Sequence, residues 1–221
     1  QDGDSVTSAG GVNLGNGSLL GIQDDGPVAS VVDVEFSRGE GEGSLDESEL
    51  AGTIPASGQG DGVYSTTLDV SVAFSGPGGS IGTVGTDVPG VTESYGLVLS
   101  GESISSGLNL LNPTDSTQPG TSIVLVSGTG ADAGKVFGVE SGNESNQVFV
   151  ISVDSSTGVV TFAYTDTTDP DNIYHSNTLL NDEETFLNTG ETGSLLVKQT
   201  ITDQDGDSVT SAGGVNLGNG S

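Results

Sequence analysis

The sequence contains no cysteine, no tryptophan and only three basic residues among its 221. Without cysteine, disulfide bonds contribute nothing to stability. The basic residues Arg38, Lys135 and Lys198 face 31 acidic residues, which gives a formal net charge of −28. Such a surface repels nucleic acid and anionic membranes, so we expect neither as a partner. No apolar run approaches the ~20 residues of a membrane-spanning helix, so we expect no membrane insertion.

Residue types that commonly serve in catalysis are scarce as well. His175 is the single histidine, and no GxSxG motif supplies a serine nucleophile. Carboxylates are numerous enough for a glycoside hydrolase, but sugar sites usually need aromatic platforms, and tryptophan is absent. We therefore predict that the chain is not an enzyme and takes no small-molecule substrate.

Glycine is abundant, with 37 residues, and hydrophobic residues make up 32% of the chain. Glycine disfavours helices, whereas short apolar alternations recur along the sequence. A chain of this charge can also be disordered, but the alternation is too regular for that interpretation. We predict an all-β fold: an antiparallel β-sandwich with Ig-like, Greek-key connections and an elongated shape.

Two segments show the alternation over their full length. Residues 63–74 place all their even-numbered side chains, six in all, on one face, and the odd-numbered ones on the other. Residues 31–36 repeat the pattern, with the even-numbered apolar side chains facing inward. Both are predicted to be half-buried strands.

Other segments predict hairpins. Residues 148–153 and 159–164 flank the turn DSSTG, as expected for two paired strands. Residues 194–202 are predicted to form a further strand, followed by the acidic turn DQDGD and by a returning strand over residues 208–217.

One motif occurs twice. The sequence QDGDSVTSAGGVNLGNGS occupies residues 1–18 and recurs letter for letter as residues 204–221, an offset of 204 − 1 = 203 residues. We therefore expect a parent protein with tandem repeats of this period, of which the chain is a fragment. The period exceeds that of solenoids, so each repeat is expected to be a domain in a string. We assign residues 1–24 to the tail of the preceding repeat and its linker, and residues 25–221 to a β-sandwich repeat lacking its last strand.

The turn after residue 202 carries carboxylates at Asp203, Asp205 and Asp207, spaced so that three oxygen ligands can meet one ion. It resembles the start of an EF-hand, but Gly206 stands at loop position 4 instead of 6, and Gly214 replaces the glutamate at position 12. We predict a β-turn site for Ca²⁺, which prefers hard oxygen donors. The alternative is a solvated, aspartate-rich hairpin turn.

Two further acidic clusters are candidate calcium sites. Asp24 and Asp25 precede a Gly-Pro joint, and adjacent carboxylates repel each other unless a cation bridges them. Asp166, Asp169 and Asp171 lie together in the sequence DTTDPDN. A simple acidic loop is the alternative interpretation of the latter cluster.

Four stretches together resemble the repeats of giant RTX-type bacterial adhesins: TDQDGDSVTSAGGVNL (202–217), GIQDDGPVASVV (21–32), SVDSSTGVVTFAY (152–164) and TDTTDPDN (165–172). The resemblance implies a β-sandwich extender exported by type I secretion, with calcium at the domain junctions. The nonapeptide calcium repeat GGxGxDxUx of that family is absent, which implies a stalk instead of an export signal or a tip.

From the repeat and this resemblance we expect a structural stalk domain of an extracellular adhesin on a bacterial cell surface. It would be stiffened by calcium and would project a distal ligand-binding region for adhesion or biofilm formation. Its partners would be neighbouring identical repeats, joined head to tail. The alternative is an adhesin module that itself binds carbohydrate or protein.

Overall fold

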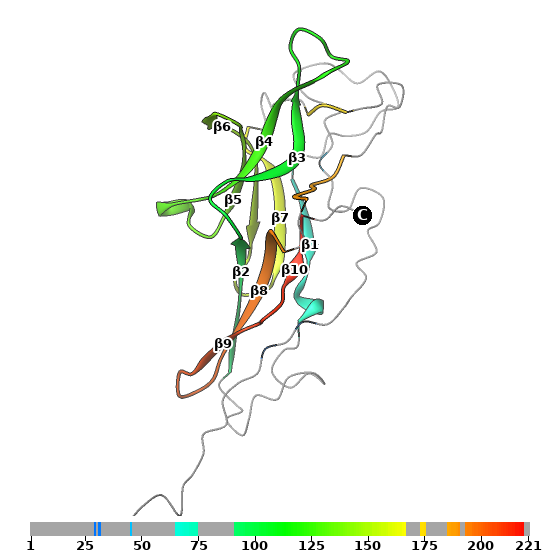
Figure 1. Ribbon diagram of the computed structural model, residues 1–221. Coiled ribbons are helices and arrows are strands. Elements are labelled where there is room, and N and C mark those ends of the chain that lie inside the picture. The colour runs from blue at the N-terminus through cyan, green and yellow to red at the C-terminus, as the bar shows by residue number, and fades with distance from the viewer. Residues whose placement is uncertain are drawn as a thin grey trace, which may run out of the picture.

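The computed structural model describes residues 29, 31, 45, 65–74, 91–166, 173–175, 185–190 and 193–218. These segments contain β-strands and two single-turn 3-10 helices (Figure 1). The strands are β1 (Ser65–Asp69), β2 (Thr92–Leu99), β3 (Ile104–Leu111), β4 (Pro119–Ser127), β5 (Val136–Glu140), β6 (Asn143–Val153), β7 (Val159–Tyr164), β8 (Leu195–Thr202), β9 (Ser208–Thr210) and β10 (Val215–Asn216). The 3-10 helices are η1 (Ser71–Ala73) and η2 (Gly130–Asp132).

The described strands form two antiparallel sheets, which confirms the predicted all-β fold. The six-stranded sheet has the order β1-β7-β6-β5-β4-β3, a meander from β3 to β7 with β1 added at its end. The second sheet has the order β10-β8-β2, and β9 also pairs with β8. The chain crosses between the sheets after β1, after β2 and after β7. The strands extend along one axis, with the β3–β4 hairpin at one end and the β8–β9 hairpin at the other (Figure 1).

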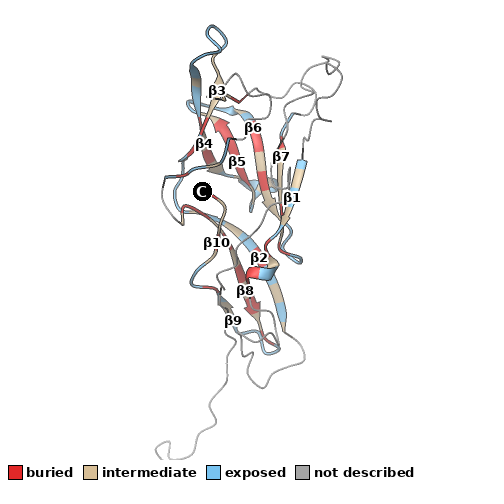
Figure 2. Cartoon of the chain, turned by 90° about the vertical axis from the view of Figure 1, so that its right-hand side faces the viewer, coloured by how far each residue is buried: buried red, intermediate tan, exposed pale blue. Residues whose placement is uncertain are grey.

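Both sheets contribute to one hydrophobic core. Ile123 and Leu125 of β4 belong to the same buried cluster as Leu195 and Val197 of β8. All four side chains are fully buried, and Figure 2 shows buried positions along strands of both sheets. Shared burial of this kind is what holds two sheets of a sandwich together.

Strand β8 shows how the alternation produces the fold. Its odd-numbered residues are buried and its even-numbered residues are partly exposed, and the strand itself confirms the one predicted over residues 194–202. The predicted hairpin is also confirmed, because β6 and β7 pair antiparallel with Phe149 opposite Tyr164. Its turn begins at Asp154, whose side chain accepts a hydrogen bond from the backbone N–H of Ser156 at 2.9 Å.

The prediction of one continuous strand over residues 63–74 was wrong. Strand β1 ends at Asp69, whose Oδ1 accepts hydrogen bonds from the backbone N–H of Ser71 at 2.9 Å and from its hydroxyl at 2.7 Å. Short polar side chains capture the local backbone in this way and compete with the sheet. The 3-10 turn that follows changes the alternation, so Val72 is 59% exposed while Ala73 and Phe74 are buried.

The predicted returning strand over residues 208–217 is interrupted. Thr210 of β9 lies opposite Thr200, and Val215 of β10 lies opposite Val197. The returning segment thus uses five positions where β8 uses three. The two extra residues form a bulge in which the Ser211 hydroxyl donates to the carbonyl oxygen of Gly213 at 2.8 Å. The returning segment therefore pairs with β8 as two short strands.

Some predictions fall largely outside the described residues. Of the predicted strand 31–36, Val31 is described, and it forms an isolated antiparallel bridge with Phe74. The boundary between residues 1–24 and 25–221 also lies outside them and stays a prediction. The helices within the described segments are single 3-10 turns, none of the size that spans a bilayer.

Candidate metal centre

The acidic turn after β8 is closed by its own backbone and by its first carboxylate. The N–H of Asp203 donates to the carbonyl oxygen of Asp207 at 3.0 Å. In return, Oδ1 of Asp203 accepts hydrogen bonds from the N–H of Gly206 at 3.1 Å and of Asp207 at 2.8 Å. Gly206 has φ +103°, a conformation that side chains with a Cβ rarely adopt. The letters DQDGD thus specify this turn, with aspartate first and glycine fourth.

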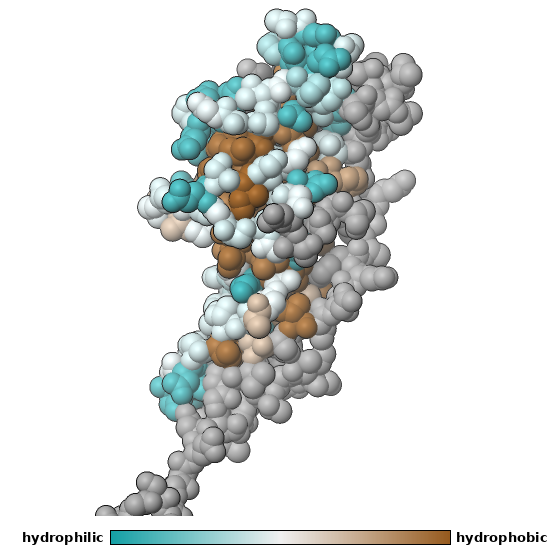
Figure 3. All heavy atoms as spheres, in the orientation of Figure 1, coloured by the Kyte–Doolittle hydropathy of each residue, from teal (hydrophilic) through white to brown (hydrophobic). Residues whose placement is uncertain are grey.

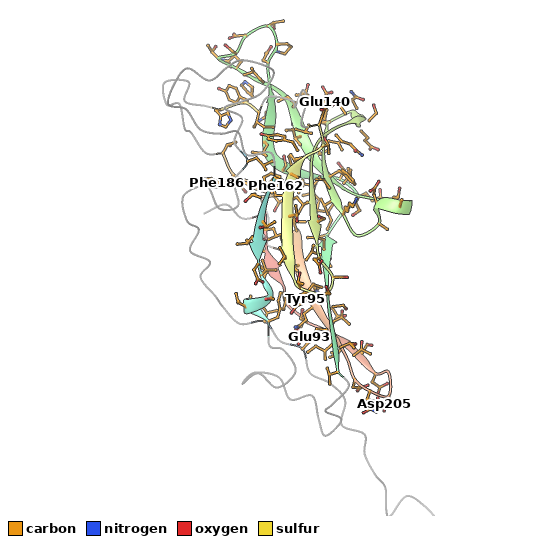
Figure 4. All side chains as sticks on the ribbon, turned by 180° about the vertical axis from the view of Figure 1, so that it is seen from behind. Glu93, Tyr95, Glu140, Phe162, Phe186 and Asp205 are labelled. Carbon is orange, nitrogen blue, oxygen red and sulfur yellow. The ribbon has the colours of Figure 1, made fainter. Side chains whose placement is uncertain are left out.

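The turn brings three carboxylates together. One side-chain oxygen each from Asp203, Asp205 and Asp207 lies within 4.8 Å of the others, so the cluster could hold a metal ion. Figure 4 shows Asp205 at the end of the β8–β9 hairpin, and Figure 3 shows hydrophilic residues gathered at that end. The three residues predicted from the sequence therefore form one cluster, which we call the acidic turn.

Asp203 differs from the other two carboxylates in its burial. Its side chain is 5% exposed, whereas Asp205 and Asp207 are exposed. Its Oδ1 is held by the turn, but its Oδ2 is buried and has no hydrogen-bond partner. A buried carboxylate oxygen without a partner loses the solvation of its charge. A cation between the three carboxylates would supply the missing interaction.

The electrostatics of the turn agree with this assignment. A side-chain hydrogen bond with Asp205 holds the pKa of Asp203 below its usual value, and the backbone N–H groups of Asp207 and Gly206 lower it further, while burial acts in the opposite direction. Two carboxylates in such contact need a shared proton or a shared cation to remain together. Where both carboxylates are ionised there is no proton to share, so a cation is the partner that can hold them together.

The donor set fits a hard divalent ion. Three carboxylates offer up to six oxygens, and Ca²⁺ takes six to eight oxygen ligands including backbone carbonyls and waters. Nitrogen and sulfur ligands, which favour transition metals, are absent from the acidic turn. Both lysines have partners elsewhere: Lys135 pairs with Asp132 at 2.8 Å, and Lys198 donates to the carbonyl oxygen of Ala212 at 3.3 Å.

The other predicted ligands are not assembled by the described structure. Asp24, Asp25, Asp169 and Asp171 lie outside the described residues. Asp166 is described and exposed, two residues after the end of β7. Both of these sites stay predictions.

A buried polar network, which the sequence analysis missed, lies beside the acidic turn on β2 and β8. The Tyr95 hydroxyl donates to Oε2 of Glu93 at 2.9 Å, and Nε2 of Gln199 donates to the same oxygen at 3.0 Å. Burial, followed by the hydrogen bond with Glu93, raises the pKa of Tyr95 to about 12. One residue in the sequence could have indicated this network. Gln199 is polar, yet it lies at an inward-facing position of β8.

The sequence model of one protein family, described as "Domain of unknown function (DUF5801)", matches residues 43–218. The match includes every described strand. No curated protein and no solved structure matches the chain.

Proposed function

The chain belongs to the DUF5801 family of domains, and we propose that it is a structural extender repeat, stiffened by calcium at the acidic turn. In this proposal the repeat is part of a stalk that holds a distal binding region away from a bacterial cell surface.

The identical 18-residue segment is the observation that carries the stalk role. Its second copy, residues 204–221, begins in the acidic turn and continues through β9 and β10. Over residues 204–218 the second copy is therefore part of the folded sheet and not a loose linker. Tandem identical copies serve to build length, whereas an enzyme seldom needs them. The long axis of the described strands suits the same role (Figure 1).

The assignment of calcium rests on the chemistry of the acidic turn. Asp203 contributes a buried oxygen without a hydrogen-bond partner, and Asp205 and Asp207 contribute exposed ones. Ca²⁺ accepts irregular oxygen geometry, whereas Mg²⁺ demands a near-ideal octahedron and keeps its waters. The net charge of −28 favours binding of cations in general.

The proposed cellular setting rests on the resemblance to RTX-type adhesins. That resemblance implies surface localisation, type I secretion and a role in adhesion or biofilm formation. Head-to-tail neighbours of the same sequence are the partners it implies. Secreted proteins meet millimolar calcium outside the cell, and extracellular modules bind it with Kd of about 10⁻⁴–10⁻³ M. Such a repeat would fold loosely before export and stiffen after it.

Small-angle scattering of a recombinant protein with two tandem repeats tests the stalk role. We expect a longer maximum dimension and less flexibility in millimolar calcium than in chelator. Calorimetric titration of the same metal-stripped protein gives the number of bound ions. Identical scattering in both conditions, despite measured calcium binding, would contradict a calcium-stiffened stalk.

A further inference from the structure

The segment after the acidic turn docks on β8 through specific contacts. The N–H of Ser211 donates to the carbonyl oxygen of Gln199 at 2.8 Å, and the N–H of Leu217 donates to that of Leu195 at 3.0 Å. Val215 is 8% exposed and belongs to the hydrophobic core. We call residues 204–221 the C-terminal segment. The edge of β8 with which this segment pairs is called the β8 edge.

The fit between this segment and the β8 edge is close. A Cβ on Gly214 would lie 2.6 Å from the carbonyl oxygen of Val197, so a larger residue does not fit there. A Cβ on Gly218 would lie 2.6 Å from Cγ2 of Thr189, whose N–H donates to the carbonyl oxygen of Gly218 at 2.8 Å. The β8 edge is therefore selective for this sequence of small, polar and apolar residues.

The chain holds a second segment that meets the same requirements. Residues 1–18, the N-terminal segment, are identical to the C-terminal segment at every position. The equivalents of the docking residues are Ser8 for Ser211, Gly11 for Gly214, Val12 for Val215, Leu14 for Leu217 and Gly15 for Gly218. Since the side chains are the same, every contact of the docked segment can form with either copy.

We propose that the N-terminal segment is an alternative ligand of the β8 edge, and that it takes the place of the C-terminal segment when the latter is disabled. Within the described residues β8 is the acceptor strand, and the sequence holds two interchangeable donor segments. This inference goes beyond the stalk role and does not depend on calcium.

The N-terminal segment of the same molecule can reach the β8 edge, because the chain that connects it to the domain is long enough. Val31 lies beside the bulge of the docked segment: a Cβ on Gly213 would be 3.8 Å from its Cγ2. Leu14, which would replace Leu217, precedes Val31 by 17 residues, a stretch that spans up to about 56 Å when extended. Leu217 is only four residues from Gly213, so at most about 14 Å separates their Cα atoms. A tether of this kind gives millimolar effective concentration, well above a micromolar protein solution.

The replacement also rebuilds the acidic turn. Asp203 directly follows the last residue of β8, so it stays in place whichever segment docks. Asp2 and Asp4 are the N-terminal equivalents of Asp205 and Asp207, so the docked N-terminal segment would bring them to those positions. The three carboxylates are then drawn from two distant parts of the chain.

Thermal unfolding of single and double variants of the full chain tests the replacement. Val215→Asp disables the C-terminal segment, because an ionised carboxylate cannot enter the core in place of a buried valine. We expect Val12→Asp alone to leave the melting temperature unchanged and Val215→Asp alone to lower it modestly. The double variant should melt roughly 5 °C or more below Val215→Asp, because no competent segment remains. A double variant as stable as Val215→Asp overturns the proposal.

Disulfide trapping identifies the donor directly, since the chain has no cysteine of its own. Leu196 lies opposite Asn216, whose N-terminal equivalent is Asn13. With Leu196→Cys and Asn13→Cys in the Val215→Asp chain, oxidation should give an intramolecular cross-link found by peptide mapping. Leu196→Cys with Asn216→Cys in the otherwise natural chain is the positive control. Failure of the first pair where the control succeeds overturns the proposal, and a covalent dimer assigns the donor to a second copy and overturns the same-chain claim.

Discussion

Replacing Asp203 with asparagine removes one negative charge from the acidic turn and keeps the hydrogen bonds that form it. The amide oxygen of asparagine can accept from the N–H groups of Gly206 and Asp207, as Oδ1 of Asp203 does. The substitution therefore separates metal binding from turn formation. In chelator we expect the variant to be at least as stable as the natural chain, because one member of a repelling cluster is gone.

In calcium the order should reverse. At about 10 mM calcium, a site with Kd near 10⁻⁴ M sees a hundredfold excess of ligand and stabilises the folded state by about 2.7 kcal/mol. For a chain of this length each kcal/mol corresponds to roughly 2–4 °C. The natural chain should therefore melt about 5–10 °C higher in calcium than in chelator, and Asp203→Asn should lose most of that increase.

Differential scanning calorimetry at low ionic strength measures these shifts. Asp154→Asn is a matched control, because Oδ1 of Asp154 also accepts turn hydrogen bonds, from the N–H groups of Ser156 and Thr157 at 2.9 Å each. It changes the net charge by the same amount away from the acidic turn, so its calcium shift should equal that of the natural chain. An undiminished calcium shift in Asp203→Asn would show that the acidic turn is not the site and refute the reasoning.

Three further predictions follow from the described contacts. Glu93→Gln should lower the pKa of Tyr95 from about 12 toward 10, which ultraviolet titration of the phenolate detects. The raised pKa belongs to the folded state of the natural chain, so the stability linked to it is lost as pH rises from about 10 to 12. Leu125→Ala should cost about 2–5 kcal/mol in chemical denaturation because Leu125 is fully buried, whereas Val72→Ala, at a side chain 59% exposed, should cost less than about 0.5 kcal/mol. NMR titration should find the pKa of Asp154 at about 2, held down first by the hydroxyl of Ser156 and then by backbone N–H groups; its stabilisation is present above about pH 4 and is lost as pH falls toward 2.

Features that depend on neighbouring residues were predictable from the sequence. The β6–β7 hairpin was predictable, because the turn sequence DSSTG stands between two short apolar runs. The acidic turn was predictable as well, since Asp203, Asp205 and Asp207 are held together by one short turn.

Two kinds of feature were not predictable from the sequence: those that depend on strand register, and those that arise where a side chain competes with the sheet for backbone hydrogen bonds. Asp69 ends β1 through two hydrogen bonds from Ser71, and the apolar pattern of residues 63–74 does not report that competition. The contact between Glu93 and Gln199 joins residues 106 positions apart. It exists because β2 and β8 pair in one particular register, which sets Tyr95 opposite Gln199. No local pattern contains that information.

The path of the chain through β8, β9 and β10 has a mechanical consequence for a protein under tension. Because the returning segment runs antiparallel to β8, the start of β8 and the end of β10 lie at the same end of the hairpin. A pull on the chain beyond Gly218 loads these pairs one after another, as in a zipper, beginning with the bonds between Thr189 and Gly218. Asp203 and its turn stand at the far end and are the last to bear the force. An ion bound there would hold the turn closed. The two strands could then pair again in the same register after the load is removed.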